Sequence, residues 1–260
     1  VMGLERGAAA VMIHSGSRGL GHQVCEDFIR RMKEAAAKYG IEPPDRQLAC
    51  APVGSAEGKA YFGAMSASAN YAWANRHCLA GLVRGVFERA FRAPAERLGL
   101  RLVYDVAHNI AKIEEHEVGG GNVRVCVHRK GATRAFAAGR PEIPSRYAKI
   151  GQPVIVPGDM GRCSYVLLGT ELAMKETWGS ICHGAGRLKS RTAAKSQFTS
   201  ARILDELAER GVTLRAASKN SILEEAPQAY KNVEYVVASC IGAGLASPVA
   251  RLRPIIVIKG

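Results

Sequence analysis

The chain has 260 residues, of which 47% are hydrophobic and 23% charged, so it can bury a core as one large domain or two small ones. Its seven cysteines include no C-x-x-C pair, which argues against a disulfide framework and a structural zinc site and favours a reducing compartment. The net charge of +13 favours a polyanionic partner, although a basic surface that only aids solubility would have the same composition.

The sequence contains no signal peptide and no uncharged run long enough to span a membrane, so a cytoplasmic or nuclear setting is expected. It starts at Val1 without an initiator methionine, and a strand-like run at residues 8–13 follows almost at once. We interpret the chain as a piece whose beginning is missing.

The first half of the chain is expected to be mainly helical. Apolar residues 11–13 predict a buried strand that runs into a glycine-rich turn at 15–21. A 3.6-residue apolar period then predicts helices over 22–39 and 57–92.

The period changes to alternation from residue 101 onward. Strands are predicted at 102–106, 113–118, 123–127, 154–156, 165–168, 212–214 and 255–258, with a turn at 119–122 and a helix at 200–210. Strands and helices in this irregular order favour a single α+β domain over residues 1–260 rather than a wound α/β sheet.

Four polar, glycine-rich segments follow or adjoin apolar runs, an arrangement typical of reactive groups on loops held by strands. In the first, residues 14–21, glycines allow backbone N–H groups to approach an anion that Arg18 would pair with, and His14 precedes them. The glycine spacing does not match a dinucleotide-binding fingerprint, and taken alone the segment is better explained as a plain strand-to-helix turn with a structural histidine.

The second segment, residues 105–109, places His108 at the predicted end of a strand as a candidate metal ligand. Asp105 is a possible orienting carboxylate, but alternation puts it on the opposite face, so the pair would need a bend. His116 and His128 are weaker candidates, and histidines on strands are often structural.

The third segment, residues 157–161 followed by Ser164, is predicted to form a turn. It would either cradle a nucleotide or be an ordinary turn without a ligand. In the fourth, residues 182–187, His183 precedes two glycines, which leaves room for a phosphate to reach a nucleophilic imidazole nitrogen. Arg187, Lys189 and Arg191 would stabilise charge on a transferring phosphoryl group, and Lys259 is a further candidate phosphate contact.

At these same segments the sequence resembles the RtcB family of RNA ligases over essentially its whole length. The strings are HSGSRG at 14–19, DVAHNIAK at 105–112, VHRKGATRA at 127–135, GQPV at 151–154, PGDMG at 157–161, CHGAGR at 182–187, EEAP at 224–227 and VARLRP at 249–254. The resemblance implies an RtcB-like α+β domain, of which this chain is the C-terminal part.

The resemblance also implies a reaction. GTP and two Mn²⁺ ions would be required, and His183 would attack the α-phosphate of GTP and carry GMP. GMP would then activate an RNA 3′-phosphate, formed where necessary from a 2′,3′-cyclic phosphate, for attack by the 5′-hydroxyl of another RNA. The partners would be such RNA ends, in tRNA splicing or RNA repair, and an archease-like activator. No membrane is implied.

The residue roles follow from the matching motifs. His14 and His108 would be manganese ligands, one for each ion of the pair. The guanine nucleotide would be held by His108, Asn109, Pro157, Gly158, Asp159, Met160, Ser164, His183, Gly184, Ala185, Gly186 and Lys259. Asp159 stands where some relatives have serine, and it would bring a negative charge close to phosphate.

In RtcB ligases, an Asp, a Cys and another His from motifs upstream of the His14 segment complete the metal site, and these motifs are absent from this sequence. The chain alone is therefore expected to be inactive. Two other functions remain open: a non-catalytic RNA- or nucleotide-binding module, and a metal-dependent phosphoesterase in which His14 and His108 hold the metals.

Overall fold

The computed structural model describes residues 1–45 and 47–260. The chain divides into two compact units, each of which is described by itself. The helical unit comprises Ala9–Ile113, and the strand unit comprises Val1–Ala8 together with Glu114–Gly260. Helices together with several small sheets confirm the predicted α+β class.

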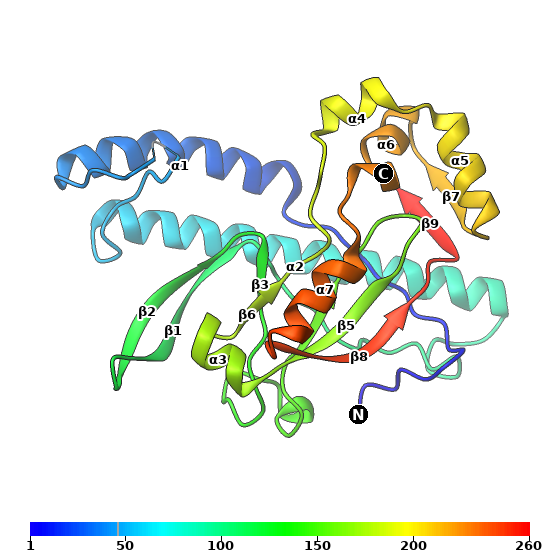
Figure 1. The fold of residues 1–260 in the computed structure, drawn as a ribbon, viewed down its shortest axis with the longest axis horizontal. Coiled ribbons are helices and arrows are strands. Elements are labelled where there is room, and N and C mark those ends of the chain that lie inside the picture. Colours follow the sequence, from blue (N-terminus) through cyan, green and yellow to red (C-terminus); the bar gives the residue numbers. More distant parts are fainter. Residues whose placement is uncertain (46) are drawn as a thin grey trace. The chain divides into compact units, whose positions relative to one another are not determined.

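Two long helices form the helical unit and pack against each other (Figure 1). α1, Arg18–Lys38, buries Phe28, Met32, Ala35 and Ala36, which lie on one face because they are three or four residues apart. α2, Ala56–Phe91, begins where the side chain of Ser55 accepts a hydrogen bond from Gly58 N, and it ends at a left-handed Arg92. The predicted helices at 22–39 and 57–92 are therefore confirmed.

The strands predicted at 11–13 and 102–106 are wrong, since both segments lack strand structure. Apolar alternation indicates an extended chain that is buried on one side, but it does not supply a neighbouring strand. Backbone groups next to the first segment accept hydrogen bonds from side chains of α2 instead: Asn75 donates to Gly16 O and Arg76 to Ser15 O.

The strand unit contains four small sheets (Figure 1). A hairpin pairs β1, Ile110–Val118, which starts in the helical unit, with β2, Gly121–Arg129. β3, Ala132–Arg134, pairs antiparallel with β6, Ser180–Cys182. The largest sheet has the order β4, Pro153–Val156, β5, Ser164–Gly169, and β8, Ala246–Leu252, all antiparallel. β7, Thr213–Ala216, lies parallel to β9, Ile256–Lys259.

Short helices connect these strands, and most begin at a side chain that accepts a backbone N–H. They are α3, Glu171–Thr177, α4, Arg191–Gln197, α5, Ser200–Glu209, α6, Lys219–Glu224, and α7, Val233–Gly242, with 3₁₀ turns at Ser145–Tyr147 and Pro227–Ala229. The predicted helix at 200–210 and the strands at 113–118, 123–127, 154–156, 165–168, 212–214 and 255–258 are confirmed with bounds that differ by at most three residues. The elements that were not predicted are α3, α4, α6, α7, β3, β6 and β8.

Two hydrophobic clusters support the strand unit. The first packs α7 residues Val233 and Val237 against β4 and β5, including Val154 and Leu167. The second packs Ile203 and Leu207 of α5 against β7, α6 and Met160. Loops that leave β4 and β6 are thereby fixed on a rigid base. Within the described residues, no helix is long and apolar enough to cross a membrane.

Candidate active site

Two histidines that are 94 residues apart in the sequence meet in the helical unit. The Nε2 atoms of His14 and His108 are 3.1 Å apart, and their rings meet edge to face with centroids separated by 5.2 Å. One ring must donate and the other accept if both are neutral. Imidazole nitrogens are also common metal ligands.

Consecutive residues of α2 connect the two histidine segments. Asn75 donates from Nδ2 to Ser15 Oγ at 2.9 Å and to Gly16 O at 3.0 Å. Arg76 donates from Nη1 to Ser15 O at 3.2 Å and from Nε to Asp105 Oδ1 at 2.7 Å. Asp105, which the sequence suggested as an orienting partner of His108, thus pairs with Arg76. We refer to Asn75 and Arg76 as the α2 clamp.

The clamp was not found from the sequence. Its signal is weak, because Asn75 and Arg76 are two of several polar residues in the middle of α2, and nothing in the sequence sets them apart. The Arg76 side chain is only 12% exposed, and its Nη2 is buried without a hydrogen-bond partner among the described residues.

In the strand unit, His183 leaves the end of β6 as a half-buried side chain. The following loop rests directly on the turn that leaves β4, because Ala185 N donates to Pro157 O at 3.0 Å. A Cβ at Gly184 would lie 3.2 Å from the same carbonyl oxygen, so glycine permits this close approach. The His183 and Pro157 segments, predicted separately, therefore form one surface.

The Pro157–Met160 turn is held by its own side chains. Asp159 accepts hydrogen bonds at Oδ1 from Gly161 N and Arg162 N at 2.9 and 3.0 Å, while Oδ2 pairs with Arg162 at 3.1 Å. The carboxylate of Asp159 is fully buried, so its charge is neutralised within the turn rather than presented to a ligand. Met160 is buried in the second hydrophobic cluster. A nucleotide contact by this turn would use the main chain.

Ser164 and Gly158 close the same turn. Gly158 N donates to Ser164 Oγ at 3.2 Å. A Cβ at Gly158 would lie 2.0 Å from Cys163 O, so no other residue fits there without movement of the backbone.

Lys259, on β9, pairs with Glu225 at 3.3 Å. Tyr230 donates its hydroxyl to the same carboxylate at 2.6 Å. Burial would raise the pKa of Glu225, but the Tyr230 hydrogen bond and the charges of Lys259 and Arg187 outweigh it and keep that pKa below its ordinary value. Burial and the Glu225 carboxylate raise the pKa of Tyr230 to about 12. Lys259 therefore belongs to a charged cluster that sequence patterns alone did not reveal.

Two of the three cations expected to assist phosphate chemistry have internal partners. Arg187 donates to Tyr230 Oη at 2.8 Å, to Glu224 O at 2.6 Å and to Lys189 O at 3.0 Å. Arg191 lies 3.7 Å from Glu224. Lys189 forms no ion pair within the described parts of the chain. Arg187 therefore connects the His183 loop to the segment around Tyr230.

The other predicted ligands are placed as follows. Asn109 is exposed directly before β1. His116 is buried and bonded to Glu114 at 2.9 Å, as expected for a structural histidine. His128 is exposed, with its Nε2 3.6 Å from Cys126 Sγ. Across residues 1–45 and 47–260, no group of three or more His, Cys, Asp or Glu side chains is placed to hold one metal ion.

Comparison with known proteins gives a consistent result along the whole chain. The family described as "tRNA-splicing ligase RtcB" matches residues 1–260. Relatives with that name include proteins of Thermococcus kodakarensis, 55% identical over 258 residues, Pyrococcus abyssi, 57% over 260, and Archaeoglobus fulgidus, 54% over 258. These alignments cover 99–100% of this chain but 54%, 28% and 54% of the respective relatives, so the chain spans about half the length of the Thermococcus protein. The chain belongs to the RtcB family.

Proposed function

We propose that this chain carries the guanylate-transfer part of an RNA ligase that joins RNA 3′-phosphate or 2′,3′-cyclic phosphate ends to 5′-hydroxyl ends, with GTP and Mn²⁺. The name of its relatives, tRNA-splicing ligase, supports an RNA-joining reaction. The observation that carries the proposal is the position of His183, half-buried beside Gly184 on a loop that is hydrogen-bonded to the Pro157 turn.

In the proposed reaction, a neutral imidazole nitrogen of His183 attacks the α-phosphorus of GTP, a P–N bond forms and pyrophosphate leaves. An oxygen of the RNA 3′-phosphate then attacks the same phosphorus, and the histidine is released. Finally the 5′-hydroxyl attacks the activated 3′-phosphate and GMP leaves. The net charge of +13 suits a polyanionic substrate.

The guanine nucleotide would be held on both sides of His183. Main-chain groups of Pro157–Met160 and of Gly184–Gly186 form one continuous surface, which supports their assignment to the nucleotide. Lys259 would contribute a charge that Glu225 orients. Asn109 and Ser164 complete the proposed contacts.

His14 and His108 fit a manganese site. Their Nε2 atoms lie 3.1 Å apart, and imidazole nitrogens are ligands that divalent metals of this kind accept, so the two side chains would hold Mn²⁺. Remaining ligands would come from residues of the longer family members. Bound Mn²⁺ would neutralise phosphate charge.

The test is transfer of label from α-³²P GTP to protein in the presence of Mn²⁺. The chain should be compared with a version that carries the upstream half of the Thermococcus relative, because this chain spans only part of that protein. Acid-labile label that is lost in His183→Ala and kept in His77→Ala, an exposed histidine on α2, supports the proposal.

Two other outcomes would replace it. RNA binding without label in either version, unchanged by His183→Ala, would indicate a non-catalytic RNA-binding module. Opening of a cyclic phosphate without GTP, dependent on His14 and His108, would indicate a metal-dependent phosphoesterase. An archease-like protein remains a proposed activator, to be added where label is weak.

A further inference from the structure

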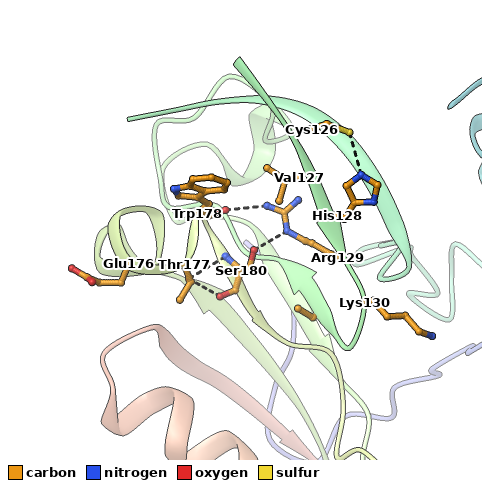
Figure 2. Close-up of a pocket in the computed structure, with 10 residues that line it drawn as sticks. Cys126, Val127, His128, Arg129, Lys130, Glu176, Thr177, Trp178 and Ser180 are labelled. Atoms are coloured by element: carbon orange, nitrogen blue, oxygen red, sulfur yellow. Dashed lines mark hydrogen bonds between the residues drawn. The ribbon is translucent and has the colours of Figure 1, made fainter. Parts of the chain in front are cut away.

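A pocket of about 540 Å³ lies in the strand unit, between the end of β2 and the turn that joins α3 to β6 (Figure 2). Its size falls within the usual range for small-ligand sites, about 300–1,000 Å³. The lining residues are Cys126, Val127, His128, Arg129, Lys130, Ala132, Glu176, Thr177, Trp178 and Ser180. None of them belongs to the nucleotide site proposed above.

Trp178 forms one wall of this pocket, and its backbone has an unfavourable conformation. Trp178 ends α3 with φ 49° and ψ 46°, a left-handed geometry that usually requires glycine. Gly179 follows, also left-handed, and a Cβ there would lie 2.4 Å from the Phe136 ring. Strained residues of this kind persist where the surroundings hold them, and they concentrate at ligand sites.

A buried polar network holds Trp178 in place. Arg129 donates from Nη2 to Trp178 O at 3.0 Å and from Nε to Ser180 Oγ at 2.9 Å, as Figure 2 shows. The same guanidinium makes two hydrogen bonds to Glu114, at 2.7 and 2.9 Å. His116, bonded to Glu114, stacks on the indole with centroids 5.5 Å apart. The wall is therefore rigid, and the charge of Arg129 is neutralised internally.

The pocket adjoins the proposed nucleophile. β3 and β6 pair with Ala132 opposite Cys182, the residue before His183. A Cβ at Gly131 would lie 4.0 Å from His183 Cε1, so the turn at 130–131 passes next to the imidazole. A ligand in the pocket would have one end close to His183.

The lining combines an aromatic wall with an available cation. The Trp178 side chain is partly exposed at the pocket. Lys130 forms no ion pair among the described residues. Aromatic side chains stack with unpaired bases, and lysine neutralises backbone phosphate. Ser180 and His128 add hydrogen-bonding groups.

We propose that this pocket binds the terminal nucleotide of a single-stranded RNA, with its base against Trp178 and its 3′-phosphate directed past Lys130 toward His183. This inference rests on the proposed function, because it assigns the RNA end that receives GMP. It adds a substrate subsite on the side of β3 and β6 and names the residues that would recognise it.

The test uses the intrinsic fluorescence of Trp178. The chain has two tryptophans, so Trp73→Phe leaves Trp178 as the single tryptophan, and position 73 does not line the pocket. A five-nucleotide RNA ending in a 3′-phosphate should quench it saturably, and the same RNA ending in a 3′-hydroxyl should bind several-fold more weakly. Lys130→Ala should weaken binding and lower the salt dependence of log K by about one. Lys149→Ala, an exposed lysine outside the pocket, should change neither.

Binding of the RNA, measured by anisotropy, without a change in Trp178 fluorescence would overturn the inference. Equal affinity for the two 3′ ends, or equal effects of Lys130→Ala and Lys149→Ala, would overturn it as well. The outcome is separate from guanylate transfer. Label on His183 without quenching refutes the pocket alone. Quenching with no label in either the chain or the version that carries the upstream half supports the RNA subsite and refutes the ligase proposal.

Discussion

Arg76 and Asp105, one on a helix and the other on the segment that carries His108, are joined by a 2.7 Å hydrogen bond from Nε to Oδ1. The same guanidinium donates to Ser15 O, next to His14. One side chain thus fixes both segments whose histidines lie 3.1 Å apart.

Arg76→Ala should therefore loosen the histidine pair. Loss of the guanidinium leaves Asp105 without its cation, which we expect to lower the free energy of unfolding by about 1–3 kcal/mol. Manganese should broaden the NMR signals of His14 and His108 together in the parent chain and less strongly, or unequally, in the variant.

The matched control is Arg84→Ala, a half-buried arginine on the same helix that forms no hydrogen bond or ion pair with either histidine segment among the described residues. Arg76→Lys should weaken the manganese broadening less than Arg76→Ala does, because a lysine can still donate to one of the two acceptors, Asp105 Oδ1 or Ser15 O. Unchanged manganese broadening in Arg76→Ala would contradict the positioning role.

Gly184→Ala tests the contact between the His183 loop and the Pro157 turn. The new methyl group would lie 3.2 Å from Pro157 O, so the loop must shift by a few tenths of an ångström. A misplacement of about 1 Å can cost about 100-fold in rate, so this smaller shift should cost less than that. Guanylate transfer, where it is measurable, should fall while Tm changes little.

Gly121→Ala is the control for this substitution, since a Cβ there meets no atom within 4 Å. A drop in activity that is the same in both variants would show that the contact at Gly184 has no special role.

Much of the fold could be predicted because its long elements carry strong periodicity. In α1, Phe28, Met32 and Ala35 follow the helical repeat and are buried as expected. The strands predicted at 11–13 and 102–106 were wrong because a short apolar run does not by itself bring a neighbouring strand: Val11, Met12 and Leu102 are 49%, 41% and 57% exposed, and neither segment pairs with a strand. β3 and β6, three residues each, are too short to show any period.

The sequence identified candidate site residues, but it could not show which residues would contact one another. Sequence spacing cannot show that Asp105 pairs with Arg76, or that Arg187 reaches Tyr230, because both partnerships depend on contacts between distant segments. The same limit applies to Asp159, whose carboxylate satisfies its own turn instead of approaching a ligand. The glycines of the motifs indicated local structure better than the charged residues did, since a Cβ at Gly158 or Gly184 would lie too close to a backbone oxygen.

Glu225 should make the free energy of unfolding depend on pH in the acidic range. Its pKa in the folded chain lies below the ordinary value of 4.5, so its contribution is present above about pH 4.5 and is lost as the pH falls through the folded pKa. Glu225→Gln removes the charge that Lys259 and Arg187 contact. The difference in unfolding free energy between the parent chain and this variant should be largest near neutral pH and shrink below pH 4.5.

Urea denaturation at pH 7 and at pH 4 would measure that difference. Glu209→Gln, an exposed glutamate at the end of α5, serves as the control and should show no pH-dependent change. A difference that stays constant across this range would mean that the carboxylate of Glu225 is not stabilised in its charged form.

The Glu114–Arg129 pair is the strongest candidate for a stability determinant, because both side chains are only 2% exposed. Glu114→Gln keeps the shape but leaves the guanidinium buried without a counter-charge, which should cost about 3–5 kcal/mol of unfolding free energy. Glu117→Gln, an exposed residue on the same strand, should change stability by less than about 0.5 kcal/mol. Because Arg129 also holds the strained Trp178 through its carbonyl, Glu114→Gln should shift the tryptophan emission of the Trp73→Phe chain before global unfolding begins. A variant that unfolds in one step, with no earlier change in emission, would show that the backbone at Trp178 is held independently of the ion pair.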